Sequence, residues 1–187
     1  MTRPAVFFDR DGVMNDVVVD GDSVRSPRTR DEFALFDGVA EAVERVSDAG
    51  YATVVVTNQP DVARGRLSQV DADWFTQRLY DTIGVDLVME CRHDSNEGCN
   101  CRKPRPGMLH AAAERLDIDL ARSFLIGDRL VDMDAAGRAG VAGILLERSW
   151  SERPSSDGSV VQPQNDFVRV DSLEAAIDLL IAGRGVY

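Results

Sequence analysis

The sequence predicts an α/β fold, a three-layer, doubly wound parallel sheet covered by helices on both faces. Short apolar runs alternate with segments of helical periodicity, which is the order of parallel β-α-β units. Two of the helical segments end at a glycine, at Gly50 and Gly140. The chain has 187 residues, enough for five or six such units around one core. We therefore expect one domain over residues 1–187.

Each expected element has a local signal. Apolar, often β-branched runs predict strands at residues 5–8, 52–56, 87–89, 123–126, 142–146 and 167–170. Apolar spacings of three and four predict helices at residues 39–49, 69–83, 108–116, 131–139 and 173–181. Asp37 is the expected cap of the first helix, and Ser68 opens a capping box for the second. Residues 17–24 predict a small hairpin, and residues 149–164, rich in Ser, Pro and Gly, predict a flexible surface loop.

The charge balance argues against two classes of partner. The chain carries 21 basic and 32 acidic residues, which gives a formal charge of -11. Such a surface repels nucleic acid and anionic lipid, so an anionic ligand needs a local basic pocket. No apolar run approaches the roughly 18 residues that a bilayer span needs, and the first residues lack the apolar segment of a secretory signal. We expect a cytoplasmic protein with no nucleic-acid or membrane partner.

Polar side chains gather where the expected strands end, which is the edge at which α/β sheets bind ligands. Asp9 and Asp11 follow the first strand, and their spacing of two points both carboxylates to the same side. Thr57 follows the second strand and Asp128 the fourth, while Lys103 precedes a helix. Two carboxylates this close repel each other, and a divalent cation relieves the repulsion. The set suits phosphoryl transfer, in which a carboxylate attacks phosphorus while Mg²⁺ and a lysine neutralise the transferred group.

A second cluster, Cys91-x-His93-x5-Cys99-x-Cys101, contains all three cysteines of the chain within eleven residues. Three thiolates and one imidazole are the ligands of a closed structural Zn²⁺ site. An odd number of cysteines does not suit a disulfide framework, and a catalytic cysteine needs a base or a strand-and-helix context that this polar loop lacks. We expect Zn²⁺ to order residues 91–101 and to position the basic residues that follow them.

Taken in order, four motifs and the zinc ligands resemble the haloacid dehalogenase superfamily. The motifs are Asp9-Arg10-Asp11-Gly12, Thr57-Asn58-Gln59, Cys99-Asn100-Cys101-Arg102-Lys103-Pro104 and Gly127-Asp128. More narrowly, they resemble its zinc-containing branch of heptose 1,7-bisphosphate phosphatases and histidinol-phosphate phosphatases. The resemblance extends from about residue 6 to residue 141 and implies the Rossmann-like fold of the superfamily. The gaps after the first two motifs are too short for a large cap domain.

The resemblance implies a Mg²⁺-dependent phosphomonoester hydrolase. It makes Asp9 the nucleophile that forms an aspartyl-phosphate, and Asp11 the acid that protonates the leaving alcohol and then the base that activates water. It implies that Asp9, the backbone carbonyl of Asp11 and Asp128 hold Mg²⁺, and that Thr57 and Lys103 hold the phosphoryl oxygens. The other residues that it assigns are Asn58, Arg102 and Arg129 as substrate contacts and Asp132 as outer support for the site.

The segments between the motifs favour a heptose bisphosphate as the substrate. Residues 63–65, 105–108 and 130–133 are more similar to the heptose enzymes than to the histidinol-phosphate enzymes. Three features depart from the family: Pro60-Asp61 replaces a small residue and glycine, Arg92 replaces a proline, and residues 16–27 are longer than usual. These positions line the expected entrance, so a histidinol-phosphate phosphatase or another small sugar-phosphate phosphatase is the alternative. In each case we expect a monomer that takes a small phosphorylated sugar or alcohol.

Two functions from other classes compete with the enzyme. A receiver domain also places acids, a threonine and a lysine around Mg²⁺, but it gives no role to Asp11 or to the zinc loop. A zinc-ribbon module for nucleic acid conflicts with the net charge and with the lack of interleaved basic and aromatic residues. Steady turnover of a phosphate ester separates the enzyme from the receiver, which releases each phosphate once. Failure to retain an oligonucleotide at any salt concentration excludes the zinc ribbon.

Overall fold

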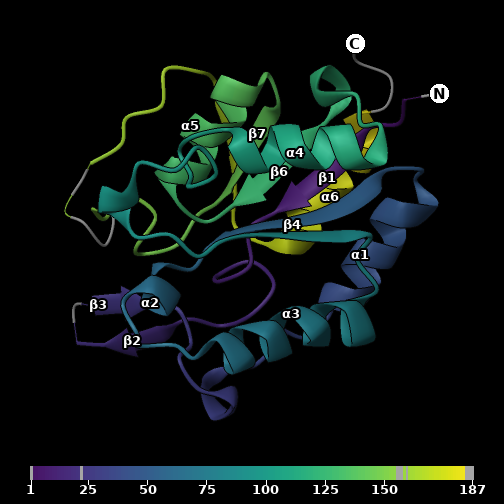
Figure 1. Cartoon of the computed structure of the whole chain (residues 1–187). Helices are drawn as coiled ribbons and strands as arrows, with labels where there is room; N and C mark the ends of the chain where they lie inside the picture. The colour runs from purple at the N-terminus through teal and green to yellow at the C-terminus, as the bar shows by residue number, and fades with distance from the viewer. Residues whose placement is uncertain (1, 22, 155–157, 159, 184–187) are drawn as a thin grey trace.

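The computed structural model describes residues 2–21, 23–154, 158 and 160–183 (Figure 1). Six strands form one parallel sheet in the order β5-β4-β1-β6-β7-β8. Their bounds are Ala5–Phe8 (β1), Ala52–Asn58 (β4), Leu87–Cys91 (β5), Phe124–Gly127 (β6), Ala142–Leu146 (β7) and Phe167–Val170 (β8). Phe8 pairs with Val55 on one side and Ile126 on the other, so β1, β4 and β6 end at the same edge of the sheet. The predicted parallel sheet is confirmed.

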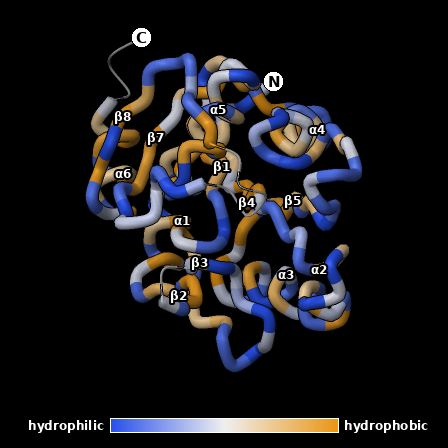
Figure 2. The backbone as a smooth tube through the Cα atoms, turned by 90° about the vertical axis from the view of Figure 1, so that its left-hand side faces the viewer, coloured by the Kyte–Doolittle hydropathy of each residue, from blue (hydrophilic) through white to orange (hydrophobic). Residues whose placement is uncertain are grey.

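Helices cover both faces of the sheet (Figure 1). They are α1 (Val39–Asp48), α2 (Pro60–Ala63), α3 (Gln69–Ile83), α4 (Gly107–Leu116), α5 (Leu130–Ala139) and α6 (Leu173–Ala182), with single 3-10 turns at Arg30–Glu32, Ser95–Glu97 and Leu120–Arg122. One hydrophobic cluster joins the sheet to α1, α3 and α6, and a second joins the opposite face to α4 and α5. Figure 2 shows hydrophobic stretches along strands such as β7 and polar stretches in the loops. The three-layer arrangement is therefore confirmed.

A small hairpin follows β1 along the chain, as the sequence predicts. Its strands, β2 (Val18–Asp20) and β3 (Ser23–Arg25), pair antiparallel with Val19 opposite Val24. The hairpin lies in the lower part of the molecule in both views (Figures 1 and 2). Among the described residues, no helix is both long and apolar enough to span a bilayer.

Several local predictions differ from the structure. Asp37 does not cap α1, because Gly38 occupies the N-cap position at φ 80° and no side chain caps the helix. The cap at Ser68 is confirmed, since its Oγ accepts from the Asp71 backbone N–H at 3.0 Å. β4 extends two residues beyond the prediction because parallel pairing continues to Asn58. The sequence does not predict α2, because four residues are too few to show helical periodicity. Residues 155–157 and 159 of the predicted loop lie outside the described residues.

Candidate active site

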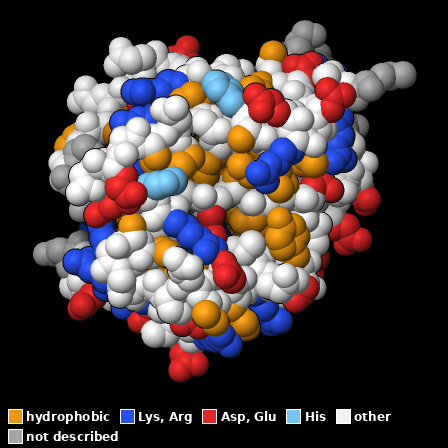
Figure 3. Space-filling view, in the orientation of Figure 1, with side chains coloured by type: hydrophobic (Ala, Val, Ile, Leu, Met, Phe, Trp, Pro, Cys, Tyr) orange, Lys and Arg blue, Asp and Glu red, His pale blue; other side chains and the backbone are white. Residues whose placement is uncertain are grey.

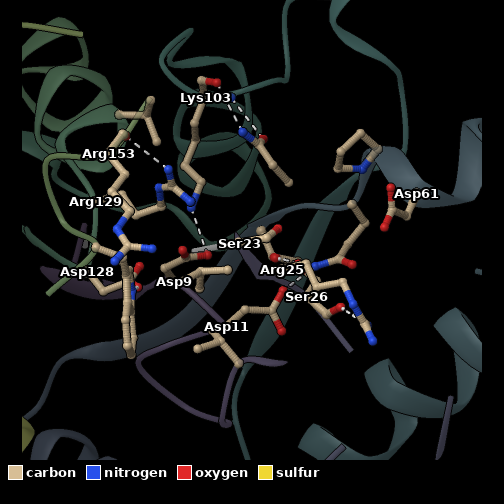
Figure 4. Close-up of a pocket in the computed structure, with 18 of the residues that line it drawn as sticks. Asp9, Asp11, Ser23, Arg25, Ser26, Asp61, Lys103, Asp128, Arg129 and Arg153 are labelled. Carbon is tan, nitrogen blue, oxygen red and sulfur yellow. Dashed lines mark hydrogen bonds and ion pairs between the residues drawn. The ribbon is translucent and has the colours of Figure 1, made fainter. Parts of the chain in front are cut away.

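The side chains predicted from the strand ends converge on one cavity of about 680 Å³ (Figure 4). Asp9 follows β1, Thr57 and Asn58 close β4, and Asp128 follows β6. These three strands are neighbours in the sheet, so their carboxyl ends bring the side chains together. The predicted residues that line the cavity are Asp9, Asp11, Thr57, Asn58, Arg102, Lys103, Asp128, Arg129 and Asp132.

Lys103, the single lysine of the chain, is buried at this cavity. Its Nζ lies 2.8 Å from Asp9 Oδ1 and 2.6 Å from Asp132 Oδ1, and it donates to the Val56 carbonyl at 2.8 Å. Burial opposes the charged form, but Asp132 and Asp9 outweigh it and hold the pKa of Lys103 above its ordinary value. The ammonium group therefore stays charged and fixed beside the Asp9 carboxylate.

Three carboxylates of the site could hold a divalent cation. Asp9, Asp128 and Asp132 offer oxygens that lie within 4.8 Å of one another. Burial raises the pKa of Asp9 to about 7, with Lys103 opposing that rise, and burial with the neighbouring Asp9 and Asp132 raises the pKa of Asp128. Asp128 Oδ1 is buried and has no hydrogen-bond partner among the described residues. An unpaired carboxylate oxygen beside two more acids is the donor set that Mg²⁺ or a similar hard cation prefers.

Gly12 forms the wall behind Asp128 and provides a test of the cation site. Its φ of 91° is left-handed, and a Cβ at this position would overlap Asp128 Oδ2. We expect Gly12→Ala to displace the carboxylate and to weaken Mg²⁺ binding about tenfold, or about 1.4 kcal/mol, by calorimetric titration. Gly84→Ala is the matched control, because Gly84 has φ 76° and open space around it. Equal Mg²⁺ affinity in the two variants would contradict the role of Gly12.

Asp11 lies outside this carboxylate cluster, in a network of hydrogen-bond donors. Its Oδ1 accepts from Arg10 Nε at 3.0 Å and from Asn15 Nδ2 at 2.9 Å. Its Oδ2 accepts from Arg10 Nη2 at 3.1 Å and from Gln59 Nε2 at 2.7 Å. Burial disfavours the charged form, but Arg10 and the hydrogen bonds outweigh it, so the pKa of Asp11 is lowered. These hydrogen bonds hold both oxygens of the Asp11 side chain in place.

The sequence-based prediction missed three residues of the site. Arg10 and Gln59 lie within the motifs, and Gln59 Nε2 also donates to Thr57 Oγ1 at 2.9 Å, which joins Thr57 to Asp11. Trp150 Nε1 donates to an oxygen of Asp128 at 2.5 Å from the loop after β7. The position of Arg10 and Gln59 beside predicted site residues is a signal that could have found them. No sequence signal places Trp150 at the site.

Arginines surround the mouth of the cavity. The cavity is lined by Arg25, Arg28, Arg64, Arg66, Arg102, Arg129 and Arg153. Arg102 Nη1 is buried and has no hydrogen-bond partner among the described residues, while Arg129 donates to two backbone carbonyls. Asp61, one of the departures from the family pattern, lies 2.6 Å from Arg28 and 3.7 Å from Arg64. On the face that Figure 3 shows, the two signs of charge are interspersed.

The four predicted zinc ligands also converge. Cys91 Sγ lies 3.6 Å from His93 Nδ1 and 3.6 Å from Cys99 Sγ. Cys101 Sγ lies 3.2 Å from Cys91 Sγ and 3.3 Å from His93 Nδ1. A tetrahedral ion with bonds of about 2.3 Å to sulfur separates its ligands by about 3.7 Å, far more than the roughly 2.05 Å of a disulfide. The cysteines are free, and this cluster of soft donors fits one Zn²⁺ ion.

The cysteine loop leads directly into Lys103. Asn58 on β4 holds the Lys103 backbone from both sides, because its Nδ2 donates to the Lys103 carbonyl and its Oδ1 accepts from the Lys103 N–H, each at 3.0 Å. The Asn100 carbonyl accepts from the N–H of Gly107, which begins α4. A metal ion in the loop would therefore fix the point from which Lys103 enters the cavity. The predicted contact of Asn58 with substrate stays a prediction.

The ion pair between Arg25 and Glu32 supports the rim of the cavity. Glu32 accepts from Arg25 Nη2 at 2.7 Å and Nη1 at 2.9 Å, and these bonds lower the pKa of Glu32 to about 2. A depressed pKa stabilises the folded state above the unfolded value of 4.5, and the effect is lost as the pH falls towards 2. After discounting for partial exposure, we expect Glu32→Gln to reduce the free energy of unfolding by about 1 kcal/mol at pH 7. In urea unfolding the difference from wild type should shrink between pH 4.5 and pH 3, and a difference that grows on acidification would contradict this.

Comparisons with known proteins agree with this geometry. Residues 100–176 match a family model described as HAD-hydrolase-like. The chain is 39% identical over 158 residues to the D-glycero-beta-D-manno-heptose-1,7-bisphosphate 7-phosphatase of Salmonella typhi, a match that covers 78% of this chain and 81% of that protein. It is 42% identical over 159 residues to the protein of the same name from Photorhabdus laumondii, with 78% and 81% covered.

A solved structure shows the same fold. The D,D-heptose 1,7-bisphosphate phosphatase from B. bronchiseptica, crystallised with magnesium and phosphate, superposes with a TM-score of 0.79 at 30% identity, over 96% of this chain and 98% of that one. Fold, site and relatives together define a phosphoric monoester hydrolase of the haloacid dehalogenase type. Within this class, the chain belongs to the family that contains the heptose 1,7-bisphosphate phosphatases.

Proposed function

We propose that this phosphatase is Mg²⁺-dependent and acts through a covalent aspartyl-phosphate on Asp9. The observation that carries the proposal is the pairing of Asp9 Oδ1 with the buried Lys103 ammonium at 2.8 Å, next to the unpaired Oδ1 of Asp128. A nucleophilic carboxylate, a fixed cation and an open ligand position are the parts that phosphoryl transfer requires. Bound by Asp9, Asp128 and the backbone carbonyl of Asp11, Mg²⁺ would supply positive charge for the phosphoryl oxygens.

The chain's own residues divide the reaction into two steps. In the first, an oxygen of Asp9 bonds to phosphorus as the bond to the leaving oxygen breaks, and that oxygen takes a proton from Asp11. In the second, a water oxygen bonds to phosphorus, the bond to Asp9 breaks, and Asp11 takes the proton of the water. Thr57 and Lys103 donate to the phosphoryl oxygens in both steps.

Trapping of the covalent state tests this mechanism. Asp11→Asn removes the base of the second step, so incubation with ³²P-labelled p-nitrophenyl phosphate, whose phenolate leaves without the proton of the first step, should leave acid-stable, hydroxylamine-labile label on the protein. Asp9→Asn combined with Asp11→Asn should carry no label. Label that survives in the double variant would contradict attachment at Asp9, and no label in the single variant would contradict the base role of Asp11.

For the substrate, we propose the 7-phosphate of D-glycero-β-D-manno-heptose 1,7-bisphosphate. The names of the relatives support it, and so does the arginine lining of the cavity mouth, which suits a substrate with a second phosphate. The test compares kcat/KM for this compound with histidinol phosphate, fructose 1,6-bisphosphate and glycerol phosphate. We expect the heptose to lead histidinol phosphate and glycerol phosphate, which have a single phosphate, by about 100-fold, because a missing charged contact costs about 1.5–3 kcal/mol. A lead for histidinol phosphate would select the alternative.

The proposal also includes a structural Zn²⁺ ion on Cys91, His93, Cys99 and Cys101. We further propose that the chain is one domain and acts as a monomer in the cytoplasm. Three free cysteines clustered as metal ligands fit a reducing compartment. Two measurements test the zinc site and the oligomeric state. We expect mass spectrometry under native conditions to show one zinc ion per chain, and light scattering to give a mass of 20.5 kDa.

A further inference from the structure

Arg10 is a buried charge to which the proposed mechanism gives no role. Its side chain has no exposed surface, and it is among the largest fully buried side chains of the described residues. Its guanidinium carbon lies 5.7 Å and 5.4 Å from the ring centroids of Phe33 and Phe75. Burial of a charge is costly unless hydrogen bonds and an opposite charge compensate for it. The location therefore requires an explanation in terms of what Arg10 contacts.

The guanidinium group is directed at the Asp11 carboxylate. Arg10 Nε and Nη2 donate to Asp11 Oδ1 and Oδ2 at 3.0 Å and 3.1 Å, a two-point contact that fixes the plane of the carboxylate. The third nitrogen, Nη1, lies 3.6 Å from Glu90 Oε1 on β5. The aromatic rings and Glu90 thus hold Arg10, and Arg10 holds Asp11.

The other donors to Asp11 cannot replace this contact. Asn15 and Gln59 each donate one hydrogen bond, to different oxygens, and both are neutral amides. These two amides restrain the carboxylate from separate segments and without charge, whereas Arg10 binds both oxygens from one rigid, charged fork. Arg10 therefore determines the direction in which the Asp11 oxygens face the cavity.

We propose that Arg10 is the positioning residue of Asp11: it holds the carboxylate in the plane from which a proton passes to the leaving oxygen in the first step and is taken from water in the second. The inference rests on the proposed function. Arg10 itself transfers no proton and makes no bond to phosphorus. Small displacements of a proton-transferring group reduce rates strongly, because proton transfer requires a hydrogen-bonded geometry.

The test uses the leaving group. Arg10→Lys keeps the positive charge and loses the two-point contact. For glycerol phosphate, whose alkoxide leaves poorly without a proton, we expect kcat/KM to fall about 100-fold, the lower end of what general acid catalysis contributes. For p-nitrophenyl phosphate, whose phenolate leaves without a proton, we expect a fall of no more than about threefold, since kcat/KM reports only the first step. A merely structural role would lower both values by the same factor and would overturn the proposal.

A second variant addresses the buried charge that Arg10→Lys could disturb. Arg10→Gln with Glu90→Gln removes the Arg10–Glu90 ion pair as a unit, so Glu90 is not left without Arg10, and Asp11 keeps the hydrogen bonds from Asn15 and Gln59. We expect the same dependence on the leaving group, with the fold checked by circular dichroism. When Asp11→Asn is already present, adding Arg10→Lys should not lower kcat/KM further for either ester, because the carboxylate that Arg10 positions has been removed. If neither Arg10 variant folds, Arg10 acts on stability and the proposal is overturned. Absence of turnover in the wild-type enzyme on both esters would instead contradict the proposed function itself.

Discussion

Asp9→Asn is expected to lower kcat by at least about 10⁴-fold while leaving the fold intact. The amide has the shape of the carboxylate and can accept the hydrogen bond from Lys103, but it is too weak a nucleophile to form the acyl phosphate. Lys103 keeps Asp132 at 2.6 Å, so the variant does not leave the buried ammonium without an anion. The melting temperature should therefore change by only a few degrees.

The measurement is steady-state release of inorganic phosphate, with zinc content and circular dichroism recorded on the same samples. Asp31→Asn is the matched control, because it makes the same chemical change at an exposed aspartate that does not line the cavity. Turnover of Asp9→Asn within about tenfold of wild type, after exclusion of deamidation by mass spectrometry, would remove the covalent mechanism.

Cys99→Ser with Cys101→Ser is expected to abolish binding of the proposed zinc ion and to affect both stability and activity. The loop has few apolar residues of its own, so the proposed zinc ion would supply most of the free energy that orders it. Binding of structural zinc contributes about 10–16 kcal/mol. If about 3–5 kcal/mol of this is coupled to the folded state, the melting temperature falls by about 10 °C. Because the loop leads into Lys103, kcat should also fall, by about 10- to 100-fold.

The two histidines of the chain provide the control for this prediction. His93 contributes Nδ1 to the cluster, whereas His110 is exposed on α4. We expect His93→Gln to weaken zinc retention against a chelator and to lower kcat, and His110→Gln to match wild type in both. An unchanged melting curve and full activity in the cysteine double variant would show that the zinc argument is wrong.

Much of the fold followed from short-range patterns. Apolar runs located the six strands, because strands in a covered parallel sheet are mostly apolar, and helical spacing located α1, α3, α4, α5 and α6. The convergence of Asp9, Thr57 and Asp128 also followed, since the carboxyl ends of parallel strands meet at one edge. Asp37 was wrongly expected to cap α1 because side-chain chemistry alone does not reveal that Gly38 takes the left-handed conformation there.

The supporting contacts could not be predicted, because they depend on packing between distant segments. Gln59 reaches Asp11 across 48 positions of the chain, and Trp150 reaches Asp128 across 22. No periodic pattern in the sequence connects residues at these separations. The burial of Arg10 is also unexpected from sequence, since arginine is rarely buried unless paired, and its partner Glu90 lies on another strand.

The compactness of the cysteine cluster in sequence bears on the order in which the molecule assembles. Closing a loop of eleven residues costs little chain entropy, whereas the contact between Ala5 and Ser123 spans 118 positions. The ligand segment can therefore be metallated on a nascent chain as soon as Cys101 has been synthesised, long before β6 exists to flank β1. Capture of the proposed zinc ion would then be an early, local event, and the slow step would be the assembly of the central strands around it.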